Sequence, residues 1–291
     1  LGIERNELLL TNGVDEAIHL LCSTFLQPGD EALIVVPTFA MYEISAAATG
    51  ARIIKVPSEN DFQFPIADLL SQVTSNTRLI AIANPNNPTG SVAAEKCLLE
   101  IASRVPEAAI LVDEAYFEFY GKTLLTQWRN LPNLFVARTF SKAYGLAGLR
   151  IGLLAGNAEH IAMISKVASP YNVNGVALAC LPTALAEQDY IRDYVKQVLR
   201  GRDELQEEFR HWDIRHWPSQ ANFVLASFGA SSSTLIQSMR ARGILVRDRS
   251  RDHGCEGCVR ITLGTNEHTA RLLRALRETL TEIKAKQVAA T

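Results

Sequence analysis

The chain has 291 residues, a formal net charge of −2 and 47% hydrophobic residues. This length accommodates one large domain or one large and one small domain, and the balanced charge argues against a nucleic acid or an anionic membrane as partner. The apolar runs are shorter than the ~18 residues of a membrane span. The five scattered cysteines, an odd number, predict a reducing, cytoplasmic compartment rather than a disulfide framework.

Short apolar runs alternate with stretches of helical periodicity in the first two thirds of the chain. The pattern predicts helices at 15–26 and 93–105, and strands at 32–37, 51–57, 78–84, 108–114, 133–139 and 150–156. Several of these strands are almost continuously apolar, which is typical of strands buried on both faces of a sheet. The alternation therefore predicts an α/β fold with a mostly parallel sheet flanked by helices.

The last third of the chain has a different pattern. Residues 158–212 read as helical and end in a long, charged, amphipathic helix at 187–212. Strands are then predicted at 222–228, 243–248 and 258–264, with a helix between the first two and another at the end of the chain. We therefore expect a large domain over residues 1–213 and a smaller C-terminal α/β domain over residues 214–291.

Polar residues follow the predicted strands of the large domain. Ligands of parallel sheets bind beyond the carboxyl ends of the strands, so these residues are candidates for a binding site. The turn TNGV at 11–14 leads into a helix N-terminus, which favours anions. The other segments are NPNNPTG at 84–90, DEAY at 113–116, and RTFSK at 138–142 with Arg150 eight residues after its lysine.

These side chains together match the functional groups of one cofactor. A lysine at the end of a buried strand, such as Lys142, can lose its proton and attack an aldehyde. A carboxylate such as Asp113 suits a pyridinium nitrogen. A phosphate group could be bound by Gly13, Thr139, Ser141 and Arg150, and a phenolate oxygen by Tyr116 and Asn87. An aromatic side chain from PTFAMY at 37–42 could cover one face of a flat ring. A molecule with all these groups is pyridoxal 5′-phosphate (PLP).

Eight segments place the sequence in a known family. In chain order they are TNGVDEAI, PTFAMY, NPNNPTG, DEAYFEF, RTFSKAYGLAGLRIG, SPYNVN, ILVRD and CVRITLGT. From Thr11 onward the chain resembles the fold-type I PLP-dependent aminotransferases, and within them the histidinol-phosphate aminotransferases. The resemblance implies a homodimer with a shared active site. It also implies transfer of an amino group from histidinol phosphate to 2-oxoglutarate, which gives imidazole acetol phosphate and glutamate in histidine biosynthesis.

The resemblance also implies a role for each matching residue. Lys142 would bond covalently to PLP and act as general base, and Asp113 would pair with the pyridine nitrogen. Arg260 would bind the substrate α-carboxylate and Arg247 the substrate phosphate. The other implied cofactor contacts are Tyr116 and Asn87 at the phenolate oxygen, Phe39 against the ring, and Gly13, Val14, Asp15, Thr139, Ser141 and Arg150 at the phosphate.

Other interpretations stay open at this point. An aromatic amino acid aminotransferase or a threonine-phosphate decarboxylase would use the same scaffold. A PLP-sensing domain of a transcription regulator would be non-enzymatic and would follow a helix-turn-helix module, and the chain could also be an inactive fragment. Cys255 and Cys258 form a single CxxC motif, which is a weak zinc or redox signal even with His253 nearby, and we predict no metal site.

The start of the chain carries one further expectation. The chain begins with Leu1, and the family's N-terminal segment of several dozen residues has no counterpart before TNGVDEAI. In the family this segment completes the small domain and lies over the substrate. We therefore expect residues 1–291 alone to be poorly soluble or to bind PLP weakly, compared with a chain that has such a segment.

Overall fold

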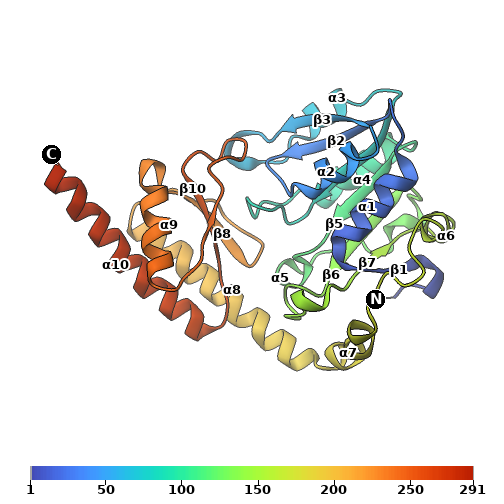
Figure 1. Cartoon of the computed structure of the whole chain (residues 1–291). Coiled ribbons are helices and arrows are strands. Elements are labelled where there is room, and N and C mark those ends of the chain that lie inside the picture. The colour runs from blue at the N-terminus through green and yellow to red at the C-terminus, as the bar shows by residue number, and fades with distance from the viewer. Residues whose placement is uncertain (1, 291) are drawn as a thin grey trace.

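A computed structural model describes the backbone of residues 2–290 and the side chains of residues 2–285. Two β-sheets organise these residues (Figure 1). The larger sheet has seven strands in the order β1-β7-β6-β5-β4-β2-β3, and the smaller has three in the order β8-β10-β9. The strands of the larger sheet are β1 (Leu8–Thr11), β2 (Glu31–Val36), β3 (Arg52–Pro57), β4 (Thr77–Ala83), β5 (Ala109–Asp113), β6 (Leu134–Thr139) and β7 (Gly152–Ala155).

The centre of the larger sheet is parallel, as the sequence predicts. β3, β2, β4, β5 and β6 pair in parallel, whereas β7 pairs antiparallel with both β6 and β1. The carboxyl ends of β4, β5 and β6 therefore lie at one edge. The segments that follow these three strands begin at Asn84, Glu114 and Phe140, and they supply most of the candidate site.

Helices cover both faces of the larger sheet. Along β4, Leu79 and Ala81 pack on one side, and Ile80 and Ile82 pack on the other, which explains the continuous apolar run. The first side is covered by α1 (Gly13–Phe25), α2 (Met41–Ala47) and α6 (Ala158–Ser165). The second is covered by α3 (Ile66–Ser71), α4 (Glu95–Arg104) and α7 (Gly175–Ala186).

The smaller sheet has a separate core. β8 (Phe223–Ser227), β9 (Arg247–Asp248) and β10 (Cys258–Thr262) pair antiparallel. Apolar residues of these strands pack with α8 (Gln188–His211), α9 (Ser232–Ala241) and α10 (Asn266–Ala290). Figure 1 shows α8 as a long diagonal helix that leads from the larger sheet to the smaller one. Because α8 packs into this second core, it contributes to the C-terminal part as well as leading into it.

The structure differs from the predicted elements in the strand predicted at 243–248 and in four short elements that were not predicted. The strand predicted at 243–248 is paired only at Arg247–Asp248, because Gly243 belongs to the turn after α9 and residues 244–246 have no strand pairing. The unpredicted elements are β1, α2, α3 and α5 (Phe117–Tyr120), and each is too short to show a clear period in the sequence. In the part of the chain that the structure describes, no helix is long and apolar enough to cross a membrane.

Candidate active site

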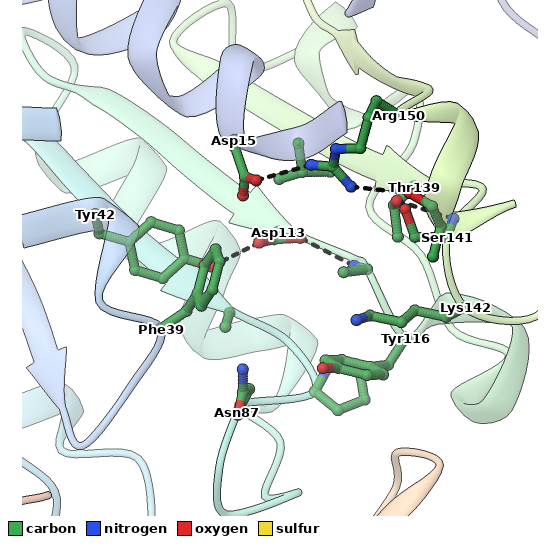
Figure 2. Close-up of a pocket in the computed structure, with 15 residues that line it drawn as sticks. Asp15, Phe39, Tyr42, Asn87, Asp113, Tyr116, Thr139, Ser141, Lys142 and Arg150 are labelled. Atoms are coloured by element: carbon green, nitrogen blue, oxygen red, sulfur yellow. Dashed lines mark hydrogen bonds and ion pairs between the residues drawn. The ribbon is translucent and has the colours of Figure 1, made fainter. Parts of the chain in front are cut away.

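A cavity of about 200 Å³ lies at the carboxyl ends of β4, β5 and β6, beside the N-terminus of α1. Figure 2 shows Lys142 pointing into this cavity between Asp113 and Tyr116. Residues from six separate segments of the chain meet here. Among the predicted site residues, those that line the cavity are Val14, Asp15, Phe39, Asn87, Asp113, Tyr116, Thr139, Ser141, Lys142 and Arg150.

Asp113 is the last residue of β5 and is 4% exposed. Tyr42 Oη donates a hydrogen bond to Asp113 Oδ2 at 2.7 Å, and the Ala115 N–H donates to Oδ1 at 3.0 Å. Burial raises the pKa of Asp113 to about 6, and these two hydrogen bonds oppose the shift. The carboxylate is therefore oriented by fixed donors and is suited to hold a cationic partner in a site with little water.

Lys142 follows β6 in the segment Ser141–Lys142–Ala143, and its Nζ lies 5.7 Å from the centre of the Tyr116 ring. Burial lowers the pKa of Lys142, and the positive charge of Arg260 lowers it further, while Asp113 opposes the shift. A lowered lysine pKa increases the neutral fraction of the amine near neutral pH, and only the neutral amine is a nucleophile or a base.

The N-terminus of α1 and Arg150 form a positively charged corner of the cavity. The first N–H groups of a helix have no acceptor within the helix, so they can bind an anion. Arg150 has a left-handed backbone with φ of 51°, and its Nη2 lies 2.8 Å from Asp15 Oδ2. Gly13 has φ of 77°, which favours glycine, and a Cβ there would lie 2.6 Å from Arg150 Nη2, so the Arg150 side chain would have to shift.

Tyr116 and Asn87 lie on the side of the cavity that faces the smaller sheet. Arg260 on β10 donates to Asn87 Oδ1, and its guanidinium lies 4.8 Å from the centre of the Phe223 ring. Burial raises the pKa of Tyr116 to about 12, and the charge of Arg260 opposes the shift. Residues of β10 thereby contact the segment after β4, which joins the two sheets at the site.

Three predicted site residues do not line the cavity itself. Gly13 lies next to the guanidinium group of Arg150, and its lack of a side chain leaves room for that group. Arg260 reaches the site through Asn87. Arg247 is exposed and is the strand partner of Arg260 in the antiparallel pair of β9 and β10. The structure thus places Arg247 next to Arg260, at the margin of the site.

The family model described as aminotransferase class I and II matches residues 1–276. The chain belongs to this family. A protein of Moorella thermoacetica named histidinol-phosphate aminotransferase is 34% identical over 286 residues, which are 96% of this chain and 74% of that protein. One of the same name from Caldanaerobacter subterraneus subsp. tengcongensis is 37% identical over 281 residues, 96% of this chain and 79% of that protein.

Solved structures of the family agree with the fold. The histidinol-phosphate aminotransferase from Clostridium acetobutylicum has a TM-score of 0.87 and 26% identity, and the match covers 95% of this chain and 84% of that one. The enzyme from Sinorhizobium meliloti, solved in complex with pyridoxal-5′-phosphate, has a TM-score of 0.88 and 25% identity. This match covers 97% of this chain and 79% of that one. The chain is therefore an aminotransferase with the PLP fold type I, and its cofactor is PLP.

The side chains of the cavity fit this cofactor. The buried carboxylate of Asp113 suits a pyridinium nitrogen, and Lys142 provides an amine with a lowered pKa. The corner of α1 and Arg150 suits a phosphate, and a Cβ at Gly13 would meet the end of the Arg150 side chain in this corner. The donor set therefore has a counterpart for the aldehyde, the phosphate and the pyridine nitrogen.

Sequence reasoning missed Tyr42, although PTFAMY was recognised. Tyr42 is fully buried, donates to Asp113, and packs edge-on against Phe39 with ring centres 5.9 Å apart. Its position at the end of the PTFAMY motif marked it as a candidate site residue. Its contact with Asp113 could not be predicted, because the two residues lie 71 positions apart in the sequence. Cys255 and Cys258 are buried beside Phe62 and Trp217, away from the cavity, and the absence of a metal there stays a prediction.

Proposed function

We propose that this aminotransferase moves the amino group of histidinol phosphate to 2-oxoglutarate, in histidine biosynthesis. The observation that carries the proposal is the convergence of Lys142, Asp113 and the Arg150 corner in one cavity, with Arg260 and Arg247 at its margin. The names of the relatives support the choice of donor. A second anion site at the margin suits a substrate that carries a phosphate or a carboxylate.

The residues of the cavity would divide the binding of the cofactor among them. Lys142 Nζ would bond to its aldehyde carbon, Asp113 would accept a hydrogen bond from the pyridinium N–H, and Phe39 would cover one ring face. Tyr116 and Asn87 would donate to the phenolate oxygen. The phosphate would be bound by the N–H groups of Gly13, Val14 and Asp15 and by the side chains of Thr139, Ser141 and Arg150.

When bound, PLP supplies an electron-withdrawing ring that stabilises negative charge on the substrate α-carbon. The protein supplies the proton transfer. After the substrate amine has replaced Lys142 at the aldehyde carbon, the freed Nζ would be neutral, and it would take the proton from the substrate α-carbon and hold it as an ammonium. The lowered pKa of Lys142 makes the neutral amine available at lower pH than for an exposed lysine. Arg260 would hold the carboxylate of 2-oxoglutarate or glutamate in a forked contact.

We also propose a cytoplasmic homodimer whose active site is completed across the subunit interface. Large apolar side chains that are exposed in this single chain gather between residues 163 and 190, and they include Tyr171, Val176 and Tyr190. Apolar surface of this kind is a feature of subunit interfaces. The five cysteines are free thiols, which suits a reducing compartment. We retain the division into residues 1–213 and 214–291 as a proposal.

A donor screen tests the proposed reaction. Purified protein with PLP is mixed with one donor at a time: histidinol phosphate, histidinol, phenylalanine or threonine phosphate. The absorbance of the cofactor, which differs between its aldehyde and amine forms, is then followed. We expect rapid conversion with histidinol phosphate and recovery with 2-oxoglutarate. Faster conversion with phenylalanine would favour an aromatic aminotransferase, and carbon dioxide release from threonine phosphate would favour a decarboxylase; either result would refute the proposed donor.

A further inference from the structure

We propose that Arg249 is a further specificity-determining residue, which binds the phosphate of the donor together with Arg260 and is held by Asp252 when no donor is bound. The inference rests on the proposed function, because it assigns a residue to the substrate of that same site. Neither Arg249 nor Asp252 belongs to the segments that carry the resemblance to the family, and neither lines the cofactor cavity.

The pairing of β9 with β10 places Arg249 on the same face as Arg260. Arg247 is the direct strand partner of Arg260, and the Arg249 N–H donates to the Cys258 carbonyl oxygen at 3.0 Å, which continues the ladder. Alternate residues of a strand share a face, and directly paired residues share it too. Arg247, Arg249 and Arg260 therefore project from one face of the smaller sheet.

Asp252 lies among these three arginines. Arg249 Nη2 is 2.6 Å from Asp252 Oδ2, and these side chains are 16% and 28% exposed. Burial raises the pKa of Asp252, while the charges of Arg249, Arg260 and Arg247 oppose the shift, so all three act on one carboxylate. Three positive charges against one negative charge leave a net positive cluster, which favours a further anion.

Two donors in this cluster are buried without a partner. Arg249 Nε and Arg260 Nε are shielded from solvent, and neither has a hydrogen-bond acceptor among the described residues. An unsatisfied buried donor on a charged group is costly, and a phosphate could accept from both guanidinium groups through different oxygens. Arg260 also donates to Asn87, which lines the cavity, so an anion bound between Arg249 and Arg260 would lie beside the cofactor site.

In its contact with Arg249, the Asp252 carboxylate would compete with the donor phosphate for the Arg249 guanidinium group. While it persists, Asp252 neutralises part of the charge that the phosphate needs. Removing the negative charge of Asp252 should therefore strengthen the binding of a phosphorylated donor. If Asp252 only held the loop in place, the same substitution would weaken binding or leave it unchanged. The sign of this effect separates the two roles.

The test compares holoenzyme variants with histidinol phosphate and with histidinol, which lacks the phosphate. We expect Arg249→Ala to lower kcat/KM for histidinol phosphate by about ten- to a hundredfold, mainly through KM, and to change kcat/KM for histidinol much less. Asp252→Asn should lower KM for histidinol phosphate and lower the inhibition constant of inorganic phosphate. The matched control is Arg251→Ala, because Arg251 is exposed in the same loop, and it should behave as wild type.

The outcomes separate this inference from the proposed function. If wild-type enzyme does not use histidinol phosphate, the proposed function fails. If wild type uses it but Arg249→Ala affects both donors equally, the assignment of Arg249 is overturned. It is overturned too if Asp252→Asn raises KM for histidinol phosphate or leaves it unchanged. Should Arg249→Ala fail to bind cofactor or fold, the direction of the Asp252→Asn effect on phosphate inhibition still decides the question.

Discussion

At the residue scale, the first prediction concerns the charge of Asp113, the buried carboxylate at the end of β5. Asp113→Asn is nearly isosteric but removes the negative charge that, in the proposed binding mode, would keep the pyridine nitrogen protonated. We expect kcat to fall by roughly ten- to a hundredfold or more, since a charge-assisted contact contributes about 1.5–3 kcal/mol, and cofactor affinity to fall less. Steady-state kinetics and PLP titration measure both quantities.

Tyr42→Phe is the matched control for this prediction. It removes the hydrogen bond to Asp113 Oδ2 but keeps the charge and the packing against Phe39. The loss of kcat in Tyr42→Phe should be smaller than in Asp113→Asn, and equivalent to about 0.5–1.5 kcal/mol. If Asp113→Asn retained near-normal turnover, another group would protonate the ring, and the assignment of Asp113 would be wrong.

The pKa of Lys142 gives a second prediction at this scale. Burial and then the charge of Arg260 lower this pKa, so the neutral amine forms below the pH range of an exposed lysine. The rate of covalent PLP attachment to apoprotein should therefore rise with pH through a midpoint below that range. Arg260→Gln removes one positive charge and should move the midpoint to higher pH, whereas Arg251→Gln should not. A midpoint unmoved by Arg260→Gln would show that Arg260 does not act on Lys142.

Individual residues also show what the sequence could predict. Lys142, Asp113, Tyr116 and Arg150 could be found because each follows a strand whose end is visible as the end of an apolar run. Tyr42 and Arg249 could not, because their partners depend on how distant segments or neighbouring strands pair. The spacing of a motif records chain order, whereas a hydrogen bond across 71 residues is a property of the folded chain.

At the element scale, the turn into α1 depends on Gly13. Gly13→Ala would put a Cβ 2.6 Å from Arg150 Nη2 and would force alanine to a φ of 77°. We expect weaker PLP binding together with lower stability, because the Arg150 side chain must shift from its position beside Asp15 and alanine is strained at a positive φ. The control is Gly121→Ala, where φ is 79° but no atom lies within 4 Å of the added Cβ. It should lower stability by about 1–2 kcal/mol with cofactor affinity unchanged.

Thermal unfolding of apoprotein and PLP titration separate these two effects. Equal PLP affinity in Gly13→Ala and wild type would contradict the placement of the phosphate at α1.

The secondary-structure elements differ in how well the sequence predicts them. Continuous apolar runs identified β2 to β6, because both faces of the sheet are covered. The runs do not encode direction, so the antiparallel pairing of β7 and the presence of β1 required the fold itself.

At the scale of the whole molecule, the exposed apolar residues between 163 and 190 give a prediction about assembly. Val176 and Tyr190 are 64% and 67% exposed in the single chain. If they lie in a subunit interface, Val176→Glu should shift the protein from dimer to monomer in size-exclusion chromatography. Leu245→Glu is the control, because Leu245 is 77% exposed but lies at the turn after α9. It should leave the dimer intact, and equal behaviour of both variants would contradict the proposed interface.

The most direct test of the central claim is to trap the cofactor on the chain. Holoenzyme is reduced with borohydride, digested, and mapped by mass spectrometry. We predict a phosphopyridoxyl label on Lys142, in the peptide that contains Ser141–Lys142–Ala143, and no label in Lys142→Ala, which should still bind PLP without a covalent bond. A label on any other lysine, or a label that persists in Lys142→Ala, would contradict the assignment of this cavity as the active site.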